Sequence, residues 1–174
     1  MEIKKMAFLG TYNSDDSIMG VIMVTDSETK PVEFRVTSSI KPTNFQKILY
    51  GNVLKEHILV ELVALPLLNA LSEQPDIILV NDPFFLGANS KVDTRVVRVL
   101  SKNQQNGNKA AKLELKSLNS KNETIYIESP EEFEDELPGI SEAINKISLY
   151  RDIMEPFERL SLACEQVHLK KTKE

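Results

Sequence analysis

A few acidic, histidine and cysteine side chains in this 174-residue chain could carry chemistry. The most suggestive is Asp82, which follows the aliphatic run 77–80 and Asn81 and precedes Pro83. Ligands of open α/β sheets bind beyond the carboxyl ends of the strands, so a carboxylate at this point favours a binding site. An aspartate before proline is also good turn chemistry, because its side chain accepts a bond from the following backbone. Both interpretations of Asp82 stay open.

The other chemically interesting residues have plainer explanations. His57 and Glu61 lie four residues apart, a spacing used by helical metal sites, but a zinc site needs three or four ligands. We therefore expect an exposed pair there and no metal or cofactor. Cys164 lies on an apolar helical stripe, which predicts a core residue rather than a nucleophile. The six glycines are scattered, which excludes a glycine-rich phosphate loop.

The segment PLLNALSEQPDIILVND, residues 66–82, resembles endonuclease V. In that family of metal-dependent nucleases with a ribonuclease H-like fold, a helix of the type P-x-L-L-x-A-L leads to a strand P-D-x-x-L-V-D. The resemblance implies that the acid after the strand binds a catalytic metal. Asp82 is the nearest counterpart, one position late because Asn81 intervenes.

The chain departs from the endonuclease V pattern at other acidic positions. The first predicted strand, AFLGTY, has no aspartate, and Ala64 stands where the family has a glutamate. Glu61, about one helical turn earlier, is a partial substitute. A two-metal nuclease needs several carboxylates that converge on its ions. A divergent metal-dependent nuclease is therefore an alternative function, and it requires Glu61, Asp26 or Asp15 to approach Asp82.

The order of the predicted strands and helices that must position these residues indicates an α+β fold with a mixed sheet. Alternating apolar residues and turn residues indicate an opening meander of three antiparallel strands, followed by helices and a central strand. That opening is ribonuclease H-like. Pro66 either kinks the second helix or starts a new one. The predicted strands cover residues 5–12, 17–26, 31–40, 75–83, 94–102, 110–118 and 123–129, and the helices cover 44–50, 53–68, 140–153 and 155–169. The fifth and sixth strands are predicted to form a hairpin with a long tip.

Length and composition indicate the number of domains and the cellular location. One domain over residues 1–174, with a short frayed C-terminal tail, suits this length. No apolar run is long enough to span a bilayer, and the first residues do not resemble a signal peptide, so no membrane association is expected. The single cysteine fits a reducing compartment. We therefore predict a cytoplasmic protein.

Charge is unevenly distributed along the chain. Residues 91–121 hold eight Lys or Arg and two Asp or Glu, whereas residues 122–142 hold eight acidic residues and no basic one. The two blocks either attract one another on the folded surface or form a partner site. No aromatic residue is interleaved among the basic ones, so nucleic acid is judged an unlikely partner. The candidate binding patch consists of Phe84, Phe85, Leu86, Arg95, Arg98, Lys112 and Lys116.

A second resemblance involves the pattern EFRVT…QKILYG…PDIILVND, which is similar to a bacterial protein family with no activity attached to it. Together these observations predict a non-catalytic cytosolic protein of bacterial type that binds an unknown protein partner or forms a homodimer. The alternatives are the divergent nuclease, and a small-ligand site beyond the end of the central strand.

Overall fold

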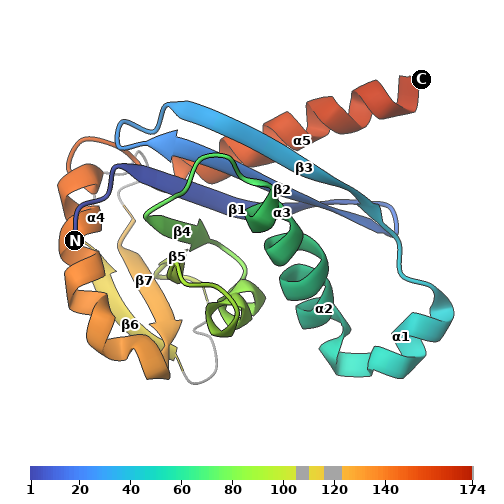
Figure 1. Cartoon of the computed structure of the whole chain (residues 1–174), viewed down its shortest axis with the longest axis horizontal. Helices are drawn as coiled ribbons and strands as arrows, with labels where there is room; N and C mark the ends of the chain where they lie inside the picture. The colour runs from blue at the N-terminus through green and yellow to red at the C-terminus, as the bar shows by residue number, and fades with distance from the viewer. Residues whose placement is uncertain (105–109, 116–122, 174) are drawn as a thin grey trace.

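The computed structural model describes residues 1–104, 110–115 and 123–173 (Figure 1). Its centre is a seven-stranded mixed sheet with the order β3-β2-β1-β4-β5-β7-β6. The strands are β1 (Lys5–Ser14), β2 (Ser17–Asp26), β3 (Pro31–Ile40), β4 (Ile77–Val80), β5 (Val96–Ser101), β6 (Ala110–Leu115) and β7 (Ile125–Pro130).

The opening of the sheet confirms the predicted ribonuclease H-like arrangement. Strands β1, β2 and β3 form an antiparallel meander, and β4 then pairs in parallel with β1 on its other side. Strand β5 continues in parallel with β4. The mixed α+β fold class is therefore confirmed.

The predicted hairpin between the fifth and sixth strands is wrong. Strand β7 lies between β5 and β6 and pairs antiparallel with both. Its alternating apolar residues let β7 bury Ile127 beside Val99 of β5 while Tyr126 pairs with Glu114 of β6. The chain therefore returns to the sheet one strand further out before β7 fills the gap.

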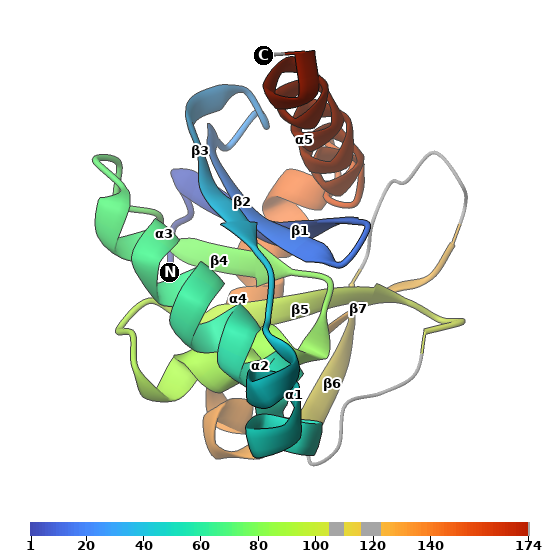
Figure 2. The same ribbon diagram turned by 90° about the vertical axis from the view of Figure 1, so that its right-hand side faces the viewer.

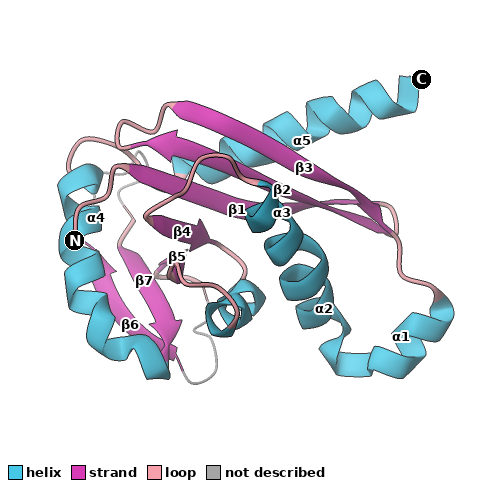
Figure 3. Cartoon of the chain, viewed as in Figure 1, coloured by secondary structure: helices cyan, strands magenta, loops and turns pink. Residues whose placement is uncertain are grey.

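Helices cover both faces of the sheet (Figures 2 and 3). One face carries the segments between β3 and β5, and its core includes Leu9, Leu59 and Phe85. The other face carries the two C-terminal helices, and its core includes Phe8 and Cys164. The helical segments are α1 (Asn44–Tyr50), η1 (Gly51–Val53), α2 (Leu54–His57), η2 (Ile58–Ala64), α3 (Leu65–Ala70), η3 (Pro83–Ser90), η4 (Glu131–Glu136), α4 (Leu137–Ser148) and α5 (Glu155–Lys173).

The helix that contains Pro66 neither stops nor restarts. Segment η2 is a π-helix between α2 and α3, and the N–H of Leu65 donates to the carbonyl of Val60, five residues earlier. Proline has no N–H and its ring crowds the preceding turn, so a wider turn lets the helix continue. The helix packs on β2 through Val63, which lies over Gly20.

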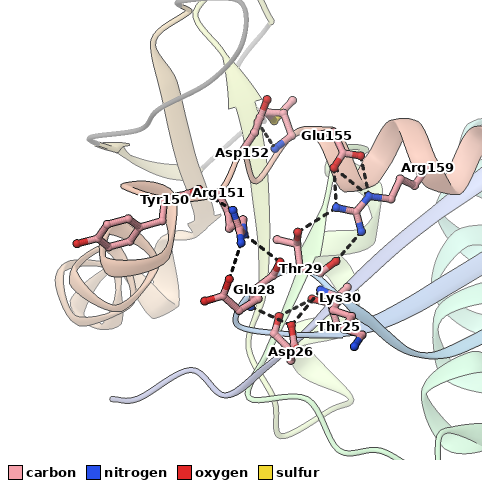
Figure 4. Close-up of polar contacts among 11 residues, drawn as sticks. Thr25, Asp26, Glu28, Thr29, Lys30, Tyr150, Arg151, Asp152, Glu155 and Arg159 are labelled. Atoms are coloured by element: carbon pink, nitrogen blue, oxygen red, sulfur yellow. Dashed lines mark hydrogen bonds and ion pairs between the residues drawn. The ribbon is translucent and has the colours of Figure 1, made fainter.

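A polar cluster joins the C-terminal helices to the turn between β2 and β3 (Figure 4). Arg159 donates to the carbonyl and hydroxyl oxygens of Thr29, over distances of 2.5 and 2.9 Å. Glu155 accepts from the same guanidinium, and these hydrogen bonds raise the pKa of Arg159. Arg151 pairs with Glu28 at 2.5 Å. The cluster therefore fixes one end of α5 to the first half of the sheet.

The described residues include no helix with the length and hydrophobicity required to cross a membrane.

Candidate functional site

A cleft of about 570 Å³ opens beyond the carboxyl ends of β1 and β4. One wall is the end of β1 and its turn into β2, and the other is the α1–α2 segment. Charged and polar side chains from both walls and from the segment after β4 line the cleft; they include Thr11, Asn13, Asp15, Asp16, Lys47, Lys55 and Asp82. The parallel pairing of β1 with β4 creates this site, because it brings the carboxyl ends of two strands together.

Asp82 forms the turn that one of the two interpretations predicts, and it also lines the cleft. Its Oδ1 accepts the N–H of Phe84 at 3.0 Å, which caps the 3-10 helix η3. Its Oδ2 lies 3.0 Å from Nζ of Lys55, on the opposite wall of the cleft. The side chain keeps 27% of its surface exposed, so it remains accessible from the cleft.

The carboxylates that a nuclease would need do not gather at Asp82. Asp26 accepts the N–H groups of Glu28 and Lys30 in the turn between β2 and β3, at the other end of the sheet. Glu61 pairs instead with Lys91. Asp15 does line the same cleft as Asp82. Over the described ranges 1–104, 110–115 and 123–173, no three His, Cys, Asp or Glu side chains are grouped so that they could hold a metal ion.

Several charges in the cleft have no counter-charge of their own. Asp15, Asp16 and Lys47 all line it, and none of them forms an ion pair within the described part of the chain. Lys55, by contrast, is shared between Asp82 and the ring of Phe84, whose centroid is 5.2 Å from Nζ. The cleft therefore presents unpaired groups of both signs.

A buried ion pair supports the end of β4 next to the cleft. Arg98 of β5 and Glu128 of β7 are almost fully buried and lie 2.9 Å apart. The Arg98 Nε also donates to the carbonyl of Asn81, at 2.9 Å. Arg98 thus ties three neighbouring strands together, which holds the backbone that presents Asp82.

The predicted binding patch does not form one continuous surface. Phe85 and Leu86 are buried in the core, whereas Phe84 is partly exposed. Arg98 is buried by its pairing with Glu128. Lys112 lies over the ring of Tyr126, and Arg95 lies over the ring of Phe133 and pairs with Glu136. Lys116 is outside the described residues.

The charge blocks do attract one another, as one of the two sequence interpretations predicts. Arg95 pairs with Glu136 at 2.8 Å, and Arg98 pairs with Glu128 at 2.9 Å. In both pairs the basic residue comes from block 91–121 and the acidic residue from block 122–142.

The two lysines of the cleft were not predicted as site residues. Lys47 belongs to α1 and Lys55 to α2, and Gly51, at φ 50°, ends α1 between them. No spacing rule for a single helix therefore joins the two lysines, and the opposite wall of the cleft depends on the β1–β4 pairing.

No protein-family model matches the chain, and no curated protein matches it. Among solved structures, the chain is similar to Ciona intestinalis endonuclease V in complex with a 24mer DNA that contains an inosine followed by a ribo-adenosine. That match has a TM-score of 0.32 and 18% identity and covers 56% of this chain and 46% of that chain.

A variant of the same enzyme with a 23mer DNA gives a TM-score of 0.38 and 14% identity, with 74% of this chain and 71% of that chain covered. Marinitoga piezophila Argonaute in complex with guide RNA gives a TM-score of 0.34 and 10% identity. That match covers 72% of this chain and 22% of the Argonaute chain. The chain spans less than half of the first endonuclease V chain and about a fifth of Argonaute. The resemblance to a bacterial family stays a prediction.

One sequence prediction is corrected by these comparisons. The prediction that nucleic acid is an unlikely partner is contradicted, because the three solved structures named above are complexes with DNA or guide RNA. The premise of the prediction also fails in this structure. Arg95 and Lys112 each lie over an aromatic ring, at 3.9 and 4.0 Å, because Phe133 and Tyr126 come from neighbouring segments rather than from the basic segment itself.

Proposed function

We propose that this protein is a non-catalytic binding module that holds a small polar ligand in the cleft between the end of β1, Asp82 and the α1–α2 wall. The observation that carries the proposal is the combination of a volume of about 570 Å³ with unpaired charges of both signs. Ligand sites usually measure roughly 300–1,000 Å³, with a few polar groups that fix orientation.

The side chains favour a ligand that carries both a positive and a negative group. Lys47 offers a cation and Asp15 and Asp16 offer anions, so a ligand with only one kind of charge would leave part of the cleft unsatisfied. The Lys55–Asp82 pair can open toward such a ligand, because each partner finds a new counter-charge when the pair separates.

Thermal unfolding of the dialysed protein with a panel of amino acids, amino sugars and nucleoside monophosphates tests the proposal. We expect at least one mixed-charge compound to raise the Tm, because a ligand bound only by the folded state stabilises it. Lys55→Met and Asp82→Asn should remove that shift. Lys91→Met is the matched control, since Lys91 also forms an exposed ion pair, with Glu61, outside the cleft lining.

Two results would count against the binding proposal. A Tm shift that survives both Lys55→Met and Asp82→Asn would place the ligand elsewhere. Cleavage of single-stranded DNA or RNA that requires Mn²⁺ and is lost in Asp82→Asn would replace the proposal with the nuclease alternative.

We also propose that the protein works in the bacterial cytoplasm as one domain. The unpaired Cys164, which is buried in the core, supports a reducing compartment.

A further inference from the structure

We infer that two copies of this chain associate by placing the α1 helix of each copy in a groove of the other between β3 and the helix that contains Pro66. This inference does not depend on the ligand cleft. It rests on two surfaces: the exposed apolar side of α1, a helix that Figure 2 turns toward the viewer, and a groove beside β3 that carries exposed apolar side chains.

The projecting surface is the outer side of α1 and η1, which we call the arm. Its apolar side chains are largely exposed: 68% for Phe45, 78% for Ile48, 64% for Leu49 and 60% for Val53. None of the seven residues of α1 is buried, and the arm extends away from the sheet in Figure 1. The three α1 residues follow the i, i+3, i+4 spacing of one helical face. The opposite side of the segment, with Lys47 and Lys55, faces the cleft.

The local chain keeps the arm helical without a core contact. Thr43 and Gln46 form a capping box at its start, with bonds of 2.9 and 3.1 Å. Gly51 ends the helix at φ 50°, a conformation that glycine adopts readily. A seven-residue helix is marginal by itself, so packing against a partner is the missing source of stability.

The concave surface is a groove of about 490 Å³ between β3 and the helix that contains Pro66. The lining combines apolar side chains, among them Phe34, Ile40 and Leu62, with polar side chains of β3. The polar ones are Arg35, Thr37 and Ser38. Phe34 and Leu62 are exposed there. Among the described strands β3 pairs only with β2, so a helix in this groove would also shield an open sheet edge.

A second copy is the occupant that these observations favour, because one chain supplies both surfaces. A two-fold dimer buries two arms and two grooves at once, since such an interface is self-complementary. Each of the four arm side chains exposes on the order of 100 Å² of accessible surface. If both grooves lose as much accessible surface as both arms, the buried area reaches roughly 1,600 Å², the usual size of a stable interface. The charged residue in the groove lining, Arg35, is already neutralised by Glu33.

Sedimentation equilibrium of the full chain with paired variants tests the dimer. We expect a dimer at micromolar concentration and a rise in Kd of at least roughly 30-fold for Leu49→Glu, because a charge would enter an apolar contact. Leu162→Glu is the control, since Leu162 is also 64% exposed but lies on α5. Circular dichroism confirms folding of each variant. A monomeric wild type, or equal effects of the two variants, would overturn the inference.

Crosslinking separates the arm-in-groove arrangement from other dimers. A mixture of Ile48→Cys and Leu62→Cys chains, treated with a short bismaleimide, should give mixed crosslinked dimers; Cys164 is buried and does not react in the folded chain. Crosslinking of Ile48→Cys with itself would show arm-to-arm packing instead. Crosslinking of Phe34→Cys with itself would show pairing of two β3 edges. Either of these outcomes overturns the arrangement.

Discussion

Asp82 shows how one side chain can belong to both the fold and the site. Replacement by alanine removes the cap on η3 and the ion pair with Lys55. We expect Asp82→Ala to lower the free energy of unfolding by about 0.5–2 kcal/mol, as is typical for a lost helix cap. Urea unfolding measures this change. Asp82→Ser, which keeps a capping oxygen but loses the charge, should recover most of it; an unrecovered loss would mean that the ion pair matters more than the cap.

Cys164 is predicted to be inert at neutral pH. Burial raises the pKa of its thiol from 9.0 to about 11. Because the pKa is higher in the folded than in the unfolded chain, the folded state gains stability below pH 9, and this gain is lost as the pH rises toward 11. A thiol reagent at pH 8 should therefore label Cys164 only in denaturant. Rapid labelling of the native protein would contradict its place in the core.

At the scale of elements, the contact between Gly20 of β2 and Val63 of the π-helix sets how closely helix and sheet approach. A Cβ atom at Gly20 would lie 2.5 Å from Cγ1 of Val63. Gly20→Ala should therefore cost about 1–3 kcal/mol, because neither element can move without disturbing the core. At Gly139 of α4 an added Cβ meets no described atom within 4 Å. Gly139→Ala should stabilise by up to about 1 kcal/mol. Guanidinium unfolding of the two variants should give shifts of opposite sign.

Much of the fold could be predicted from local patterns, and the errors lie where distant pairing decides. Strands β1 to β3 and helix α1 follow from alternation, turn residues and the capping box, which act over a few residues. The insertion of β7 between β5 and β6 depends on strand order, which alternation does not encode. The continuous helix through Pro66 depends on a π-turn, because proline alone predicts only a kink or a break.

For the same reason, the sequence indicated only two residues of the cleft, Asp82 and, as a candidate partner, Asp15. The residue after a buried strand can be identified from the sequence, but its partners cannot. Lys55 comes from α2, which is held beside the cleft because it continues into η2, and η2 packs on β2. Asp26 was a candidate partner of Asp82 by residue type, yet the antiparallel direction of β2 carries it to the opposite end of the sheet.

At the scale of the whole molecule, the contacts of Arg159 join the C-terminal helical layer to the first half of the sheet. Arg159→Met should lower the free energy of unfolding by about 1–2 kcal/mol, since it removes charge-assisted hydrogen bonds to Thr29 that are only partly screened. Arg151→Met is the control. Its partner Glu28 is mostly exposed, so the loss should stay within about 0.5 kcal/mol. If urea unfolding gives the same loss of unfolding free energy for both variants, the hydrogen bonds to Thr29 add no more stability than an exposed ion pair.

The same contact has a consequence for the order in which the protein matures during its synthesis. Thr29 holds a left-handed backbone conformation, with φ 61°, that is costly for a β-branched residue. The guanidinium that steadies it belongs to Arg159, 130 positions later. Ribosomes release a chain from its N-terminus onward. The first strands can therefore pair early, but the turn between β2 and β3 reaches its final shape only after nearly the whole chain has been released.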